Sequence, residues 1–426
     1  MGTRWMVLAL GILLAGSPAT AEETASREVE RRIGILAEEI EKLKTQLVLP
    51  EKEELKPYFG LGPAASRVYG ITRGVSLAGY GELTYENFKG TKDDGTPSGK
   101  RDQADFLRSV IYLGYKFSDR VIFNSELEFE HASTGKGGEA SVEFAHLDFL
   151  LHPAANLRMG MVLIPMGWVN EQHEPVTFHG VLRPDVERFI LPTTWRENGV
   201  GVFGEPLPGL DYRFYVTAGL KASGFSAAEG VRGGRQSGAR SLAEDLAFTG
   251  RLDYKGVPGL TLGASFFAGN SGQGDQVGGQ TLEAPVTLWD LHAQWRWRGI
   301  DLRALYAEGC VGEADRVNLL KGVTGKASVG SRMKGWYLQG AYDVLPLFRP
   351  RTTHALSPFV RYEQLNTQAA VPAGYQADPA NDRQVWTMGL TYKPIPNVAV
   401  KFDYQDRRNA AGTGINQWNV GMSYMF

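Results

Sequence analysis

The chain has 426 residues, with 45 Lys and Arg against 47 Asp and Glu, so its formal net charge of −2 gives no electrostatic case for nucleic acid as a partner. The 52 glycines, 21 prolines and 11% aromatic residues suit many strands joined by tight turns, and a single cysteine excludes a disulfide framework and a cysteine zinc cluster. No run after the first 21 residues approaches 18 uninterrupted apolar residues, which excludes a helical membrane protein.

Residues 1–21 have the organisation of a secretory signal peptide. Arg4 supplies a positive n-region, 6–14 is a short apolar run, and the small residues ATA at 19–21 form a cleavage site. We therefore expect the mature chain to begin at Glu22. The alternative is a retained membrane anchor, for which the apolar run is too short to span a bilayer.

Residues 22–50 predict a helix with a heptad seam. The apolar residues recur at the 4-3-4-3-4 spacing of a coiled coil: Val29, Ile33, Leu36, Ile40, Leu43 and Leu47. Three heptads are marginal alone, so this periplasmic helix should need partners. Ile at the a positions with Leu at d nominally favours two strands, but we expect three because barrels of the size predicted below assemble as trimers. The alternative is a single amphipathic helix lying on the barrel. Pro50 ends the helix, and 51–73 is expected to be a linker.

From Val75 the hydrophobic period changes to two, and it stays so to the end of the chain. In one run Trp289, Leu291, Ala293, Trp295 and Trp297 alternate with Asp290, His292, Gln294, Arg296 and Arg298. A lipid-facing apolar side and a wet, charged lumen require this alternation. Backbone groups in hydrocarbon must all be paired, which strands achieve only in a closed barrel. The predicted fold class is therefore all-β, a transmembrane antiparallel barrel over 74–426, preceded by a short α-helical coiled coil.

Such runs number about sixteen, with 14 to 18 as the allowed range. They cover 75–88, 104–117, 120–131, 140–152, 155–164, 197–205, 209–221, 244–255, 259–269, 284–298, 300–309, 332–345, 354–366, 383–393, 397–407 and 415–426. Short and long connections alternate, the arrangement of outer-membrane barrels with short periplasmic turns and long external loops. A barrel this wide leaves an aqueous channel. The last strand ends on Phe426, a terminal aromatic typical of the signal that the barrel-assembly machinery reads.

The third long connection, 165–196, combines length, four prolines and charges of both signs, and we expect it to fold into the lumen and narrow the pore. Charged rings at a constriction set selectivity. The candidate residues that line it or bind solute are Arg183, Arg188 and Arg196 of the loop, Arg108, Arg158, Arg213, Arg251, Arg296 and Arg361 of the strands, and the acids Glu126, Glu128 and Asp148. Our interpretation is a transverse field that orients small anionic solutes. The alternative is that these charges pair and pin the loop to the wall.

Two histidine groups raise the possibility of a metal site, one around His173 and His179 and one around His146. Neither has a tight ligand spacing on a defined element, so we expect no metal and no cofactor. A barrel phospholipase would need a nucleophilic serine with histidine at the lipid face, and no serine stands in such a context. A non-transporting barrel, either an adhesin or the sheath of an electron-transfer complex, stays open beside the porin hypothesis.

Several motifs resemble the phosphate-selective porin O/P family. They are GYGELTYENF at 79–88, FNSELEFEHA at 123–132, NLRMGMVLIPMGWVNEQHEP at 156–175 and RPDVERFILPTTWRENGVGVFGE at 183–205. The heptad helix is similar to that of related dicarboxylate-type porins. The resemblance implies a homotrimeric, 16-stranded passive channel in outer-membrane lipid that prefers anions. The sequence shows scattered arginines in place of that family's arginine ladder, so phosphate and small organic anions both stay open as solutes.

Overall fold

The computed structural model describes residues 31–39, 55–135 and 137–426. The chain forms two compact units, 1–54 and 55–426. In the first unit, residues 31–39 are helical and expose Ile33 and Leu36, two residues of the predicted heptad seam. The signal peptide and the rest of the predicted coiled coil lie outside the described residues. Among the described residues, no helix is long and apolar enough to cross a membrane.

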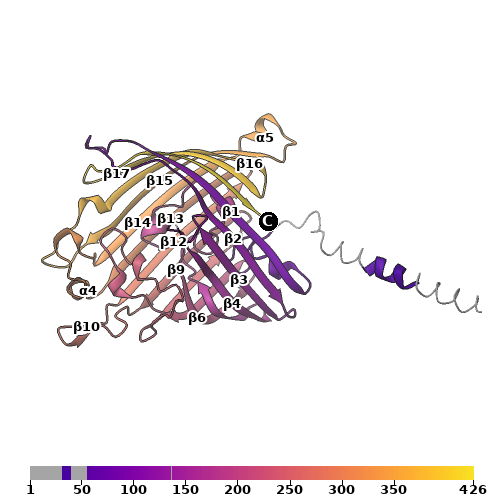
Figure 1. Ribbon diagram of the computed structural model, residues 1–426, viewed down its shortest axis with the longest axis horizontal. Coiled ribbons are helices and arrows are strands. Elements are labelled where there is room, and N and C mark those ends of the chain that lie inside the picture. Colours follow the sequence, from indigo (N-terminus) through magenta and orange to yellow (C-terminus); the bar gives the residue numbers. More distant parts are fainter. Residues whose placement is uncertain (1–30, 40–54, 136) are drawn as a thin grey trace, which may run out of the picture. The chain divides into compact units, whose positions relative to one another are not determined.

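In the described part of 55–426, sixteen antiparallel strands close into a barrel (Figure 1). They are β1 (Gly74–Phe88), β2 (Gln103–Lys116), β3 (Val121–Glu130), β4 (Ala140–His152), β5 (Ala155–Leu163), β6 (Arg196–Leu207), β7 (Leu210–Ala218), β8 (Leu246–Tyr254), β9 (Leu260–Gly269), β12 (Val286–Trp297), β13 (Ile300–Val311), β14 (Arg332–Tyr342), β15 (Ala355–Ala370), β16 (Asp382–Ile395), β17 (Val398–Asn409) and β18 (Gln417–Met425). Each strand pairs with the strands that precede and follow it around the wall, and β1 pairs with β18 to complete the ring. The prediction of a closed antiparallel barrel of about sixteen strands is confirmed.

The connections carry the remaining short elements. These are α2 (Arg67–Gly70), η1 (Pro175–Thr177), α3 (Val186–Phe189), η2 (Ala222–Gly224), η3 (Arg232–Gly234), the ribbon β10 (Gln276–Val277) and β11 (Gln280–Thr281), α4 (Ala314–Lys321), η4 (Gly325–Ala327), α5 (Leu345–Phe348) and η5 (Pro379–Asn381). The antiparallel order puts alternate connections at opposite ends of the barrel. We call these ends the loop end, which carries 164–195, and the turn end, which carries 117–120.

The strands separate two environments, as their period of two requires. On β12, Leu291 and Trp297 point outward and are about half exposed, whereas Asp290 and His292 are buried inside. The same division recurs on β17, where Phe402 is exposed and Asp403 is buried. The outer face is therefore broadly apolar, and the charged side chains of the strands point into the lumen.

Two segments of the chain pack inside the barrel. The first, residues 164–195, we call the lumenal loop. Its buried Ile164, Ile190 and Trp195 join a hydrophobic cluster with wall residues such as Phe267 and Tyr337. Part of the lumen is therefore a packed core, where the strand number alone predicts an aqueous channel.

The second, residues 55–73, we call the N-terminal segment. It was expected to be a linker, but it belongs to the same compact unit as the barrel. Leu61 and Ala65 are buried against Tyr112 and Phe144 of the wall. The segment contains no strand and no long helix, so the alternating pattern that identifies strands could not predict where it lies.

Candidate functional site

The lumenal loop turns inward because its two ends are tied together. The backbone N–H of Ile164 donates to the carbonyl of Trp195 at 3.0 Å. The Asn170 side chain joins the same two ends. Its amide nitrogen donates to the carbonyls of Ile164 and Trp195, at 2.7 and 2.9 Å, and its oxygen accepts from the Trp195 N–H at 2.6 Å. The side-chain amide of Asn170 therefore supplies hydrogen-bond partners to backbone groups that have no strand partner where the loop leaves the wall.

Glu187 on α3 organises the interior of the loop. One of its carboxylate oxygens accepts from the N–H groups of Trp168 and Val169, at 2.6 and 2.7 Å. The other accepts from the hydroxyl of Tyr337 on β14 at 2.7 Å. Burial raises the pKa of Glu187, and the three donors oppose that rise. The residue thus joins two parts of the loop to each other and to the wall.

The loop crosses the lumen between residues 173 and 177. His173 Nε2 lies 2.9 Å from Glu126 Oε1 on β3, and Arg303 on β13 donates to the carbonyl of Thr177 at 2.8 Å. In the ring of strands that the structure describes, β3 and β13 are eight positions apart, which is the opposite side of a sixteen-stranded barrel. A third wall position, Lys401 on β17, donates to the carbonyls of Pro175 and Gly180.

Most of the candidate strand charges pair with each other or hold the loop. Arg158 binds Asp148 at 2.7 Å, Arg196 binds Glu143 at 2.5 Å, Arg361 binds Glu363 at 2.8 Å, Arg108 lies 2.9 Å from Glu82 and 3.5 Å from Glu128, Arg213 binds Glu171 at 3.0 Å, and Arg251 binds Asp253 at 2.8 Å. Arg296 binds Asp301 at 3.1 Å and is largely exposed. Of these pairs, Arg213 with Glu171 joins the wall to the lumenal loop, and the others join residues of the wall to each other.

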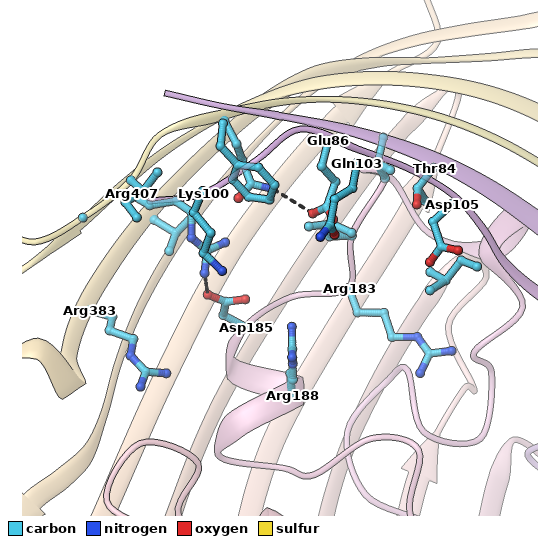
Figure 2. A pocket seen from close by; sticks show the side chains of 18 of the residues that line it. Thr84, Glu86, Lys100, Gln103, Asp105, Arg183, Asp185, Arg188, Arg383 and Arg407 are labelled. Carbon is cyan, nitrogen blue, oxygen red and sulfur yellow. Dashed lines mark hydrogen bonds and ion pairs between the residues drawn. The ribbon is translucent and has the colours of Figure 1, made fainter. Parts of the chain in front are cut away.

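A cavity of about 640 Å³ lies at the loop end, and we call it the loop-side cavity. Unlike the paired wall charges, several of its arginines have no carboxylate partner among the described residues. The lumenal loop contributes Arg183 and Arg188 to its lining, and other elements contribute Lys100, Arg108, Arg232, Arg383, Arg407 and Arg408. Figure 2 shows Arg183, Arg188, Arg383 and Arg407 around the cavity. The acids at the same cavity are Glu82, Glu86, Asp105 and Asp185. Arginines that looked scattered in the sequence therefore converge in space, which corrects our expectation.

Four of these arginines, Arg183, Arg188, Arg232 and Arg383, form no ion pair among the described residues. Buried Nη2 of Arg183 has no hydrogen-bond partner. Arg188 lies with its guanidinium 5.0 Å from the ring of Phe189, Arg232 donates to the carbonyls of Arg188 and Thr193, and Arg383 donates to the carbonyl of Ala228 and the Asn381 side chain.

Burial, with nearby positive charge as a second cause, lowers the pKa of two of these groups. Burial lowers the pKa of Arg232 to about 9, with neighbouring Arg235 and Arg188 adding to the effect. Burial also lowers the pKa of Arg183, with Arg108 as the next cause. A pKa falls in this way when a cation is desolvated near like charges. The loop-side cavity therefore gathers positive charge beside its four acids, and Arg183, Arg188, Arg232 and Arg383 form no ion pair among the described residues.

A second cavity, of about 710 Å³, opens at the turn end, and we call it the turn-side cavity. Arg213, Arg251 and Arg296 line it, together with residues 57–60 of the N-terminal segment and Trp168 of the lumenal loop. It shares no lining residue with the loop-side cavity.

The cavity residues that sequence reasoning missed differ in how much signal they carry. Arg407 has the inward parity of buried Asp403 and Gln405 on β17, and Arg383 has the parity of buried Val385 on β16. Both were therefore accessible to the period-two argument. Arg232 lies in the connection 219–245, where no period indicates direction.

Comparison with known proteins identifies one relative that aligns with most of the chain. No family model matches it. Over 397 residues it is 42% identical to an uncharacterized protein of Aquifex aeolicus (strain VF5), an alignment that covers 90% of this chain and 87% of that protein. The chain belongs to the same family as this protein.

Solved structures show the fold at a greater distance. The chain is similar to Salmonella typhi OmpF in complex with daunomycin (13% identity, TM-score 0.54, 83% of this chain and 98% of that one). It is similar to an anion-selective porin from Comamonas acidovorans (12%, 0.53, 83% and 99%) and to the outer membrane channel DcaP of Acinetobacter baumannii (13%, 0.51, 83% and 97%). At these identities the likeness concerns the fold alone, which is the barrel of outer-membrane porins.

Proposed function

We propose that the protein is an outer-membrane porin, a channel for passive diffusion that prefers small anions. The observation that carries this proposal is the loop-side cavity, where Arg183, Arg188, Arg232 and Arg383 have no carboxylate partner among the described residues. Guanidinium groups bind carboxylate and phosphate oxygens through paired hydrogen bonds. The cavity therefore suits phosphate and small organic anions alike.

The wall supports a membrane location. Leu291, Val400 and Phe402 are among many large apolar side chains exposed on the outer face, which matches the lipid-facing band of such barrels. The terminal Phe426 pairs with Gly79 of β1 through both backbone groups, at 3.0 and 2.9 Å. We include in the proposal secretion through the signal peptide, assembly through the terminal aromatic strand, and a homotrimer clamped by the periplasmic helix.

The arrangement of charge supports selectivity at the entrance. Arginines from several elements surround the cavity, whereas Glu86 and Asp105 lie toward β1 and β2 on one side of it (Figure 2). A charged cleft with low-dielectric walls concentrates counter-ions and raises their entry rate. Anions should therefore be enriched where the lumenal loop narrows the path.

The test is ion selectivity in planar bilayers. The wild-type chain in a KCl gradient should give a reversal potential shifted toward chloride. The double variant Arg183→Gln, Arg188→Gln should lower the chloride-to-potassium permeability ratio several-fold. Arg332→Gln is the matched control, because Arg332 pairs with Glu308 on the outer face and lines neither cavity. A cation-shifted wild type refutes the anion preference, and an insulating barrel refutes the porin.

A further inference from the structure

The N-terminal segment is bound inside the barrel by a small set of polar contacts. The side-chain amide of Asn124 on β3 donates to the carbonyl of Ala65 at 2.8 Å. The Tyr69 hydroxyl donates to Asp148 on β4 at 2.7 Å and accepts from Arg158 at 3.2 Å. These wall residues lie on β3, β4 and β5, and further contacts reach β1, where Arg67 donates to the carbonyl of Leu77, and β6, where Phe59 packs against Phe203.

The lumenal loop clamps the segment from the other side. One oxygen of Glu174 accepts from the backbone N–H groups of Ala64 and Ala65, at 3.0 and 2.9 Å. The fit also depends on two glycines. A Cβ atom on Gly62 would lie 2.5 Å from Glu174 Oε1, and one on Gly60 would lie 2.6 Å from Glu171 Oε1. The sequence FGLG at 59–62 therefore presents bare backbone to two acidic side chains.

The segment and the loop together form a layer between the two cavities. Residues 57–60 line the turn-side cavity. The stretch of the loop that crosses the lumen, 173–177, includes Glu174. The loop-side cavity begins on the other face of the loop, at Phe178. The Glu174 clamp therefore lies in the stretch of the loop between Gln172, which lines the turn-side cavity, and Phe178, which lines the loop-side cavity.

The N-terminal segment lies outside the strand ladders of the barrel wall. Its residues take part in none of the strand pairings that the structure describes, so its removal breaks no ladder of the wall. It joins β1 at Gly74, which has φ of +95° and lies at the turn end of the barrel. A glycine in this conformation is a natural pivot, because only glycine adopts it without strain.

The clamp itself is poorly satisfied. The second carboxylate oxygen of Glu174 is buried and has no hydrogen-bond partner. An unsatisfied buried acceptor destabilises the arrangement that contains it. This unsatisfied oxygen lowers the stability of the closed arrangement, which a reversible latch requires.

We propose that residues 57–70 are a gate, latched by Glu174 of the lumenal loop, which opens the path between the two cavities by swinging about Gly74 toward the turn end. This inference rests on the proposed porin function. The lumenal loop stays in place as the selectivity element, and the N-terminal segment alone moves.

A disulfide can lock the gate. An ideal Cβ on Gly114 of β2 would lie 2.7 Å from the Cβ of Val68, and a disulfide needs about 3.8 Å, a small adjustment. The test uses the full chain with Val68→Cys and Gly114→Cys in a Cys310→Ser background, recorded in planar bilayers. Oxidation should hold the channel in its low-conducting state, and dithiothreitol should restore wild-type openings. Each single cysteine variant should be indifferent to both reagents.

A second variant weakens the latch. Glu174→Ala removes two charge-assisted hydrogen bonds and should raise the open-to-closed ratio about tenfold. Glu139→Ala, at an exposed acid outside the segment, should leave the ratio unchanged. Heat-modified gel mobility reports that each barrel has folded.

The outcomes separate the two proposals. Equal conductance of the cross-linked and reduced channels, with anion selectivity intact, overturns the gate and leaves the porin. A barrel that conducts in none of these states, including Glu174→Ala, overturns both. If Glu174→Ala fails to fold, the disulfide comparison decides alone.

Discussion

Glu187 provides a sharp test of the lumenal loop, because its two oxygens have different tasks. One binds the N–H groups of Trp168 and Val169, and the other binds the Tyr337 hydroxyl. Glu187→Gln retains one oxygen for the two amides, and its NH₂ group can donate to a rotated Tyr337 hydroxyl. Glu187→Ala retains neither contact. The pair of variants therefore separates loss of charge from loss of geometry.

The expected magnitudes follow from the hydrogen bonds. In the alanine variant two buried N–H groups lose their acceptor, at about 1–3 kcal/mol each, and a hydroxyl contact is lost as well. The docked loop should therefore lose about 3–5 kcal/mol. Glutamine loses only the extra strength of charge-assisted bonds, about 1 kcal/mol. Both changes act on local opening of the loop, since Glu187 contributes nothing to the strand ladders.

Hydrogen–deuterium exchange of a peptide that covers residues 166–170 is the assay. Exchange of the Trp168 and Val169 amides should accelerate by about 100-fold or more in Glu187→Ala, and by less than about tenfold in Glu187→Gln. Glu205→Ala is the control, because that carboxylate accepts one backbone N–H, from Gly209, in a turn outside the loop. Unchanged exchange in the alanine variant would refute the assigned role of Glu187.

Two further predictions concern pH and assembly. Burial raises the pKa of Glu174 from its ordinary 4.5 to about 7, so the stabilisation from its bound proton is fully present below pH 4.5 and is lost as the pH rises through 7. Exchange protection of the Ala64 and Ala65 amides should fall over that window by up to about 3 kcal/mol, and Glu174→Gln should lack this part of the pH dependence, which a parallel slope in the variant would contradict. Deletion of residues 22–50 should lower the temperature at which trimers dissociate on a gel and leave the barrel folded; trimers that withstand the same heating would show that the helix is no clamp.

The sequence by itself determined the barrel, because a period of two reports the two environments of a strand directly. The run 284–298 was predicted as a strand and β12 occupies Val286–Trp297, with its tryptophans outside and Asp290 and His292 inside. Boundaries were less well determined. β15 continues to Ala370, beyond the predicted end at 366, because Ala370 still pairs with Arg332 of β14 after a register shift that no pattern shows.

Only the tertiary structure decided what fills the lumen. Asp185 meets Arg407 across 222 positions of sequence, and Glu174 holds Ala64 across 110. Periodicity predicts whether a strand residue faces the lipid or the lumen. It does not predict which residue of a distant loop will contact that side chain. The convergence of Arg183, Arg188, Arg232 and Arg383, and the packing of residues 55–73 against the inside of the wall, depend on such meetings. They arise when the ring of strands closes and brings opposite walls within reach of one loop.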